Sequence, residues 1–164
     1  MGNELKMEPL LNQSGIVNVQ FGSDVQVVQP VNLYNCSIGT GSFIGPFTEI
    51  QHGVVIGNRC RVQSHSFICE GVVIGDDTFV GHGVMFINDV FSAEGPARGN
   101  TTLWKVTHIG QHVSIGSNAT ILPVKICDHV VIGAGSVVTK DITIAGTYAG
   151  NPAVLLTQFT NFSK

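Results

Sequence analysis

The chain has 164 residues, a length that suits one domain with a hydrophobic core of its own. A net charge of −3 with only 8 Lys and Arg argues against a nucleic-acid phosphate surface, and the scattered basic residues form no patch for an anionic membrane. The sequence has no run of 18 apolar residues and no signal-peptide pattern at its start, and its four cysteines lack CxxC spacing. We therefore predict a cytoplasmic protein with reduced, buried thiols and no membrane span.

The hydrophobic residues, 43% of the chain, follow a strict period. Residues 1–12 are expected to form an atypical cap, and a repeat begins near residue 16. Val19, Val25 and Val31 keep a spacing of six, and the frame then slips before Ile38. Nine residues follow at intervals of six without a miss: Ile38, Ile44, Ile50, Ile56, Val62, Ile68, Ile74, Val80 and Phe86.

A period of six matches neither a helical stripe nor a continuing two-residue alternation. It fits a short strand and a turn, repeated, so that three units make an 18-residue triangular coil. Coils stack through parallel-strand hydrogen bonds about 4.8 Å apart, and the recurring aliphatic residue points inward. Glycine often follows that residue, as at 38–39 and 44–45, and suits a corner where a Cβ would clash. The predicted fold is an all-β solenoid, a parallel β-helix.

Residues 18 positions apart should stack in such a coil. His52, Glu70 and Asn88 have this spacing, and each stands two places after an inward residue. They are predicted to form a polar ladder along one corner, while His65 occupies a different corner position. The top rung of the ladder is the point where the repeat stops.

The interruption covers about residues 87–108, and its Gly, Pro, Ser and Asn content predicts an extruded loop. Loops of this length inside a compact domain are usually functional, so we expect this one to form a wall of a site. The repeat resumes at Ile109 and slips once more in ILPVKIC, between Ile121 and Ile126. We predict one β-helix domain over 1–164 with six or seven coils and a C-terminal cap at about 145–164.

The hexads, the stretches QSHSFICEGV and VGHGVMFIND, the IGAGSVVTKDI segment and the closing GNPA resemble the hexapeptide-repeat acyltransferases. The chain is similar in particular to small N-acetyltransferases that acylate an amino group of a nucleotide-linked deoxysugar. The resemblance implies a left-handed β-helix, a homotrimer with sites between neighbouring prisms, and acetyl-CoA or another acyl-CoA as donor. It implies no metal.

Candidate residues on the acceptor side lie near the loop. The resemblance implies that Asn88 contacts the reacting amine, while Asp89 holds the sugar or the loop itself. Glu70 is a candidate to orient a histidine or to accept a proton, and Arg98 is a candidate to meet a nucleotide phosphate. Two histidines, His65 and His82, stand on the repeats nearest the loop and are candidate proton acceptors.

The donor side rests on the resemblance alone. It implies that pantetheine runs along the later coils near Gly116, Ser117, Ala134 and Gly135, and that Lys140 meets a CoA phosphate. The chain departs from the family pattern in two places. Val154-Leu155-Leu156 follows GNPA where relatives often carry a basic residue, and ILPVKIC stands where relatives often read ILPG.

Two other functions use the same scaffold. O-acetylation of a sugar or serine hydroxyl would need a well-placed general base. A γ-class carbonic anhydrase would need three converging imidazoles, with paired histidines five apart. Here His108 and His112 are four apart, and no other pair matches, so the sequence favours N-acyl transfer.

Overall fold

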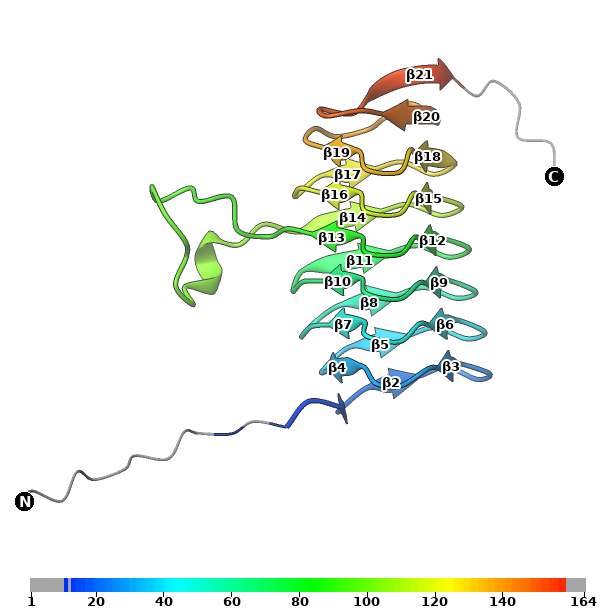
Figure 1. The fold of residues 1–164 in the computed structure, drawn as a ribbon, viewed down its shortest axis with the longest axis vertical. Helices are drawn as coiled ribbons and strands as arrows, with labels where there is room; N and C mark the ends of the chain where they lie inside the picture. The colour runs from blue at the N-terminus through cyan, green and yellow to red at the C-terminus, as the bar shows by residue number, and fades with distance from the viewer. Residues whose placement is uncertain (1–10, 12, 159–164) are drawn as a thin grey trace, which may run out of the picture.

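A computed structural model describes residues 11 and 13–158 of the chain. Short parallel strands stack into a three-sided β-helix of about seven turns, which rises from the N-terminal to the C-terminal end in Figure 1. The predicted fold class is confirmed. No helix among the described residues is long and apolar enough to cross a membrane.

Each side of the prism is one sheet, here called sheet A, B or C. Sheet A contains β1 (Ile16–Val17), β4 (Asn32–Tyr34), β7 (Glu49–Ile50), β10 (Phe67–Ile68), β13 (Met85–Phe86), β16 (Thr120–Ile121) and β19 (Val137–Val138). Sheet B contains β2 (Gln20–Phe21), β5 (Ser37–Ile38), β8 (Val55–Ile56), β11 (Val72–Ile74), β14 (Thr107–Ile109) and β17 (Lys125–Ile126). Sheet C contains β3 (Gln26–Val27), β6 (Phe43–Ile44), β9 (Arg61–Val62), β12 (Phe79–Val80), β15 (Ser114–Ile115), β18 (Val130–Ile132), β20 (Gly146–Ala149) and β21 (Val154–Gln158).

The core is a column of inward side chains inside the prism. The predicted residues from Ile38 to Phe86 are all buried, and Ile50 pairs with Ile68 in register 18 residues away. A second buried column, two residues earlier in each hexad, was not predicted. Its members are small or β-branched: Cys36, Ser42, Thr48, Val54, Cys60, Ser66, Val72, Thr78 and Val84.

The predicted frame of the first coil is wrong by two residues. Phe21 pairs with Ile38, and Val27 pairs with Ile44, so these residues hold the main inward register. Val19, Val25 and Val31 fall in register with the second column instead. Both columns carry apolar residues six apart, so the period alone could not distinguish them. The second slip, after Ile121, is confirmed because Ile109 pairs with Ile126, 17 residues away.

Turns at the three edges of the prism define its corners. The A–B corner holds the turns at 52–53 and 70–71, the C–A corner those at 64–65, 82–83, 117–118 and 134–135, and the B–C corner those at 58–59 and 76–77. The second residue of a corner turn has a left-handed backbone, as in His65 with φ 62°. Where a glycine follows the inward residue it has a different role: a Cβ on Gly39 would lie 2.5 Å from the backbone of Gly57 in the next coil.

The predicted loop is present and extends away from the stack at the level of β13 (Figure 1). It covers residues 87–106, because Thr107 and His108 already belong to β14. One short 3-10 helix, η1 (Thr101–Leu103), is capped by the Asn100 side chain. Val72 pairs with Thr107 across the insertion, so the coils keep their register on both sides of the loop.

At the C-terminal end, β20 continues sheet C in parallel and β21 folds back antiparallel to it. This pair occupies the described part of the predicted cap at about 145–164, and residues 159–164 lie outside the described residues. Most of the predicted N-terminal cap, residues 1–10 and 12, also lies outside them. Cys36, Cys60 and Cys69 are buried free thiols, and Cys127 is half-buried.

Candidate functional site

The polar ladder predicted from 18-residue spacing lies on the A–B corner. β7, β10 and β13 stack in register, so the residues that follow them, His52, Glu70 and Asn88, form one column. The Asn88 Nδ2 group donates a hydrogen bond to the Glu70 carbonyl oxygen at 3.2 Å. Lys105 donates its N–H to the Asn88 carbonyl at 2.9 Å, which joins the two ends of the loop. Glu70 and Asn88 are therefore brought together, as predicted.

Three residues beside this ladder were missed by sequence reasoning. Gln51 accepts the Glu70 N–H at 3.3 Å through Oε1 and donates from Nε2 to Glu49 at 2.8 Å. Burial raises the pKa of Tyr34, and the nearby carboxylates of Glu49 and Glu70 raise it further. Gln51 stands directly before His52 in the chain. This cluster therefore lies next to the ladder that the 18-residue spacing predicted.

The A–B corner offers hydrogen-bond acceptors without partners. Among the described residues, no group donates to Asn88 Oδ1 or to the half-buried Glu70 carboxylate. A carboxamide oxygen and a carboxylate can accept hydrogen bonds from an amine, and the carboxylate can take its proton. The corner is therefore chemically suited to an amine substrate.

Two predicted residues lie in the loop. Asp89 accepts the Phe91 N–H at 3.0 Å and the Ala97 N–H at 2.7 Å, one on each carboxylate oxygen. Of the two roles considered for Asp89, the contacts are those of a residue that holds the loop. Arg98 is exposed, and no ion pair joins it to another described residue.

The two candidate histidines lie on the C–A corner. The His82 Nδ1 atom is 2.9 Å from the Ser64 hydroxyl, one coil below, and both groups are exposed to solvent. His65 stacks on Phe47 with ring centroids 4.8 Å apart. Ser64 was missed, although its spacing of 18 from His82 is the same signal that located the ladder.

The predicted donor residues also lie on the C–A corner, with one exception. Gly116 and Ser117 follow β15, and Ala134 and Gly135 follow β18 directly above them. Lys140 follows β19 and therefore lies at the other edge of sheet A, in the turn toward sheet B.

Backbone N–H groups on the C–A corner are available as donors. Within the described part of the chain, the N–H groups of Ser117 and Ala134 donate to no acceptor. On the B–C corner, side chains from the next coil accept several of the corresponding N–H groups, as Asp76 does for Asn58 at 2.9 Å and Asp128 does for Gln111 at 2.8 Å. The C–A corner thus has, at Ser117 and Ala134, backbone donors that no described side chain caps.

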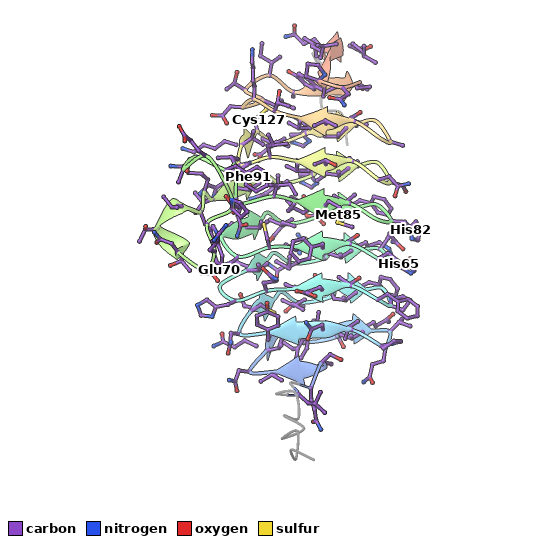
Figure 2. All side chains as sticks on the ribbon, turned by 60° about the vertical axis from the view of Figure 1, so that its left-hand side comes forward. His65, Glu70, His82, Met85, Phe91 and Cys127 are labelled. Atoms are coloured by element: carbon purple, nitrogen blue, oxygen red, sulfur yellow. The ribbon has the colours of Figure 1, made fainter. Side chains whose placement is uncertain are left out.

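Sheet A separates the two halves of the predicted site within one chain. Five residues lead from His65 to Glu70, at most roughly 16 Å of extended chain at about 3.3 Å per residue. Figure 2 shows Glu70 and Phe91 on the side that carries the loop, and His65 and His82 on the other side, with Met85 between them. Acceptors and donors of one chain therefore do not meet.

The metal alternative has no ligand set among the described residues, since no three His, Cys, Asp or Glu side chains are grouped to hold an ion. His112 stacks on His129 with ring planes 12° apart, a face-to-face arrangement. His108 lies on β14 and pairs in register with Lys125.

Two stretches of the chain match known repeat families. Residues 35–70 match the bacterial transferase hexapeptide family (six repeats), and residues 106–140 match the hexapeptide repeat of succinyl-transferase. Both matched stretches carry the hexapeptide repeat of transferases. The two matched stretches lie on either side of the loop, so the hexapeptide repeats form the scaffold and the loop is inserted between them.

Known relatives share part of this sequence, and solved structures share its fold. The bifunctional protein GlmU of Latilactobacillus sakei is 36% identical over 117 residues, which are 65% of this chain and 23% of that protein. The chain thus spans about a quarter of the length of that relative. AntD, an N-acyltransferase from Bacillus cereus whose structure contains dTDP and coenzyme A, superposes with a TM-score of 0.75 at 23% identity, over 87% of this chain and 84% of AntD. A maltose O-acetyltransferase from Clostridium difficile 630 has a TM-score of 0.54 at 26% identity, over 86% of this chain and 71% of that one.

Proposed function

We propose that this protein is a CoA-dependent N-acyltransferase that moves an acetyl or other short acyl group from acyl-CoA to the amino group of a nucleotide-linked amino-deoxysugar. The observation that carries the proposal is the pair of complementary corners: free acceptors, Asn88 Oδ1 and the Glu70 carboxylate, on one edge of sheet A, and free backbone donors on the other. AntD, with dTDP and coenzyme A bound, supports the choice of substrates.

The reaction needs both corners at one place, which one chain does not provide. We propose a homotrimer in which the A–B corner of one β-helix domain, spanning 1–164, faces the C–A corner of the next. The exposed Met85 side chain and half-buried Phe67 between the corners give sheet A an apolar outer surface that suits such a contact. Because acyl-CoA is a cytoplasmic metabolite, the proposal places the protein in the cytoplasm.

The chemistry assigns each corner a separate task. The neutral amine attacks the thioester carbonyl carbon, and the C–N bond forms as the carbonyl electrons move to oxygen. The N–H of Ser117 or Ala134 donates to that oxyanion. Asn88 Oδ1 accepts an N–H of the amine, and Glu70 takes the proton that the new ammonium group loses. The C–S bond then breaks, and the CoA thiolate leaves and is protonated.

The remaining candidates act around this centre. His65 and His82 would lie across the subunit contact as alternative proton acceptors, and Arg98 on the loop would contact the nucleotide phosphates. Lys140 would meet a CoA phosphate from the last coil. Asp89 would keep the loop in the shape that the acceptor site requires.

A panel of acyl-CoAs against nucleotide-linked aminosugars, read by released thiol, tests the proposal directly. We expect thiol release with at least one aminosugar and none with the matching sugar that carries hydroxyl in place of amine. Release with neither acceptor class would refute acyl transfer to nucleotide sugars.

O-acetylation is the second candidate, favoured by the His82–Ser64 contact of 2.9 Å, which could orient an imidazole as the base that a hydroxyl acceptor needs. The maltose O-acetyltransferase shares the fold. His82→Gln separates the two functions. It should abolish transfer to a hydroxyl but leave transfer to an amine within about tenfold, below the usual effect of a general base.

A further inference from the structure

A directed chain of hydrogen bonds ends at the proposed acceptor site. Asn88 Nδ2 donates to the Glu70 carbonyl at 3.2 Å, the Glu70 N–H donates to Gln51 Oε1 at 3.3 Å, and Gln51 Nε2 donates to Glu49 Oε1 at 2.8 Å. Every link points the same way, and the chain ends on a carboxylate. The Glu70 carbonyl and N–H belong to two adjacent peptide groups, so the first two links are joined through the Glu70 backbone, and the link to an ionised acceptor is the strongest.

The chain determines which end of the Asn88 carboxamide is free. Nδ2 faces the Glu70 carbonyl oxygen, so a flipped amide would place two acceptor oxygens against each other. The unflipped amide leaves Oδ1 for an incoming N–H. Glu70 is held from both sides, at its carbonyl by Asn88 and at its N–H by Gln51.

Gln51 is the link that this geometry depends on. The equivalent positions in the next two coils hold buried Cys69 and half-buried Ile87. Neither has a side-chain carbonyl that could accept a backbone N–H as Gln51 does. Gln51 alone in this part of the column carries both a carbonyl that accepts from Glu70 and an amide that needs an acceptor of its own. Glu49, on the outer face of β7, supplies that acceptor.

We propose that Gln51 and Glu49 are positioning residues for the acceptor pair, and that they hold Asn88 Oδ1 and the Glu70 carboxylate toward the amine. This inference rests on the proposed function for its catalytic consequence. Its structural part, the orientation of the Asn88 amide, stands by itself. The raised pKa of Tyr34, which burial and the two carboxylates cause, agrees with the closeness of Glu49 and Glu70.

Three variants test whether the hydrogen bond between positions 49 and 51 is needed. In Gln51→Glu the new carboxylate still accepts from the Glu70 N–H, but it cannot donate to Glu49 and repels it. The double variant Glu49→Gln with Gln51→Glu exchanges the two side chains, so the amide introduced at position 49 donates to the carboxylate at position 51. The hydrogen bond between positions 49 and 51 is then restored with its direction reversed and with net charge unchanged, and position 51 still accepts the Glu70 N–H. Gln111→Glu, which makes the same change on the B–C corner, is the matched charge control.

We expect Gln51→Glu to lower kcat for the aminosugar at least tenfold with little change in the KM for acyl-CoA. The double variant should recover a kcat within about threefold of that of the unmodified protein. Gln111→Glu should have the same kcat as the unmodified protein. A double variant as impaired as Gln51→Glu, or a fully active Gln51→Glu, overturns the inference. If Gln51 had only a structural role, the urea midpoint of each variant would instead fall and recover in parallel with its activity.

A second measurement does not depend on activity. In protein labelled with 15N-asparagine, the Asn88 side-chain signals are assigned by their loss in Asn88→Ala. Their chemical shifts should change in Gln51→Glu and return to the original values in the double variant. Unchanged chemical shifts in Gln51→Glu would overturn the inference. If the unmodified protein transfers no acyl group to any aminosugar, the proposed function fails while this measurement still decides the positioning role.

Discussion

The hydroxyl of Thr107 should weaken the fold, and removing it should strengthen it. Thr107 begins β14 with 1% of its surface exposed, and its Oγ1 is the buried side-chain polar atom without a hydrogen-bond partner among the described residues. Its neighbours in register, Val72 below and Val124 above, are valines. A buried unpaired hydroxyl costs about 1–3 kcal/mol. Because valine has nearly the same shape as threonine, Thr107→Val should raise the free energy of unfolding by about 1–2 kcal/mol.

Thr78 provides the matched control, since it is equally buried and its hydroxyl has partners. Its Oγ1 donates to the Gly110 carbonyl at 3.1 Å and accepts the Val113 N–H at 3.3 Å. Thr78→Val leaves both backbone groups unpaired inside the prism and should lower the free energy of unfolding by about 1–3 kcal/mol. Replacing threonine with valine should therefore change the free energy of unfolding in opposite directions at two positions of equal burial.

Urea unfolding followed by far-UV circular dichroism, at one protein concentration for all variants, measures both effects. We expect the midpoint of Thr107→Val above that of the unmodified protein and the midpoint of Thr78→Val below it, with equal slopes. If Thr107→Val instead lowers the midpoint as Thr78→Val does, its hydroxyl has a partner in solution and the reasoning is wrong.

Four further predictions concern the site and the thiols. Asn88→Ala should lower kcat/KM at least tenfold while light scattering still gives a trimeric mass; unchanged turnover would remove Asn88 from the mechanism. Incubation with EDTA should leave acyl transfer intact, and loss of activity that zinc restores would favour a metalloenzyme. Gly116→Ala should weaken acyl-CoA binding in a direct titration, because a Cβ there would overlap the backbone of Ala134; unchanged binding would place the donor elsewhere. Burial raises the pKa of Cys36 to about 11 and that of Cys69 to about 12, against about 8.5 for a thiol in an unfolded chain. Their stabilising contribution is therefore complete below about pH 8.5 and is lost as pH rises toward 11–12, so the urea midpoint should fall over that range.

The sequence predicted the coil and the ladder because both depend on spacing alone, and it predicted the loop because the repeat stops there and the composition changes to Gly, Pro, Ser and Asn. An inward residue every six positions determines which side chains share a column, and 18-residue spacing placed Asn88 over Glu70 correctly. Ser64 and His82 have the same 18-residue spacing and are paired in the same way on the second corner.

Spacing could not predict features that depend on side-chain torsions or on hydrogen bonds. The carboxamide of Gln51 turns toward Glu49, and the period of six does not encode that direction. The free N–H groups of Ser117 and Ala134 follow from the absence of a capping side chain above them among the described residues, which is visible only when all three corners are compared. The error in the first coil has a related cause, since two apolar columns with one period cannot be distinguished by the period.

The loop is inserted into a coil that closes behind it. Val72 and Thr107 pair as if no chain lay between the repeats, and Lys105 donates to the Asn88 carbonyl at the base of the insertion. Doubling the length of a flexible insertion adds only about 0.6 kcal/mol of closure entropy. Evolution, or an engineer, can therefore exchange the segment between Phe86 and Thr107 to reach new acceptors while the rigid frame beneath it keeps its shape.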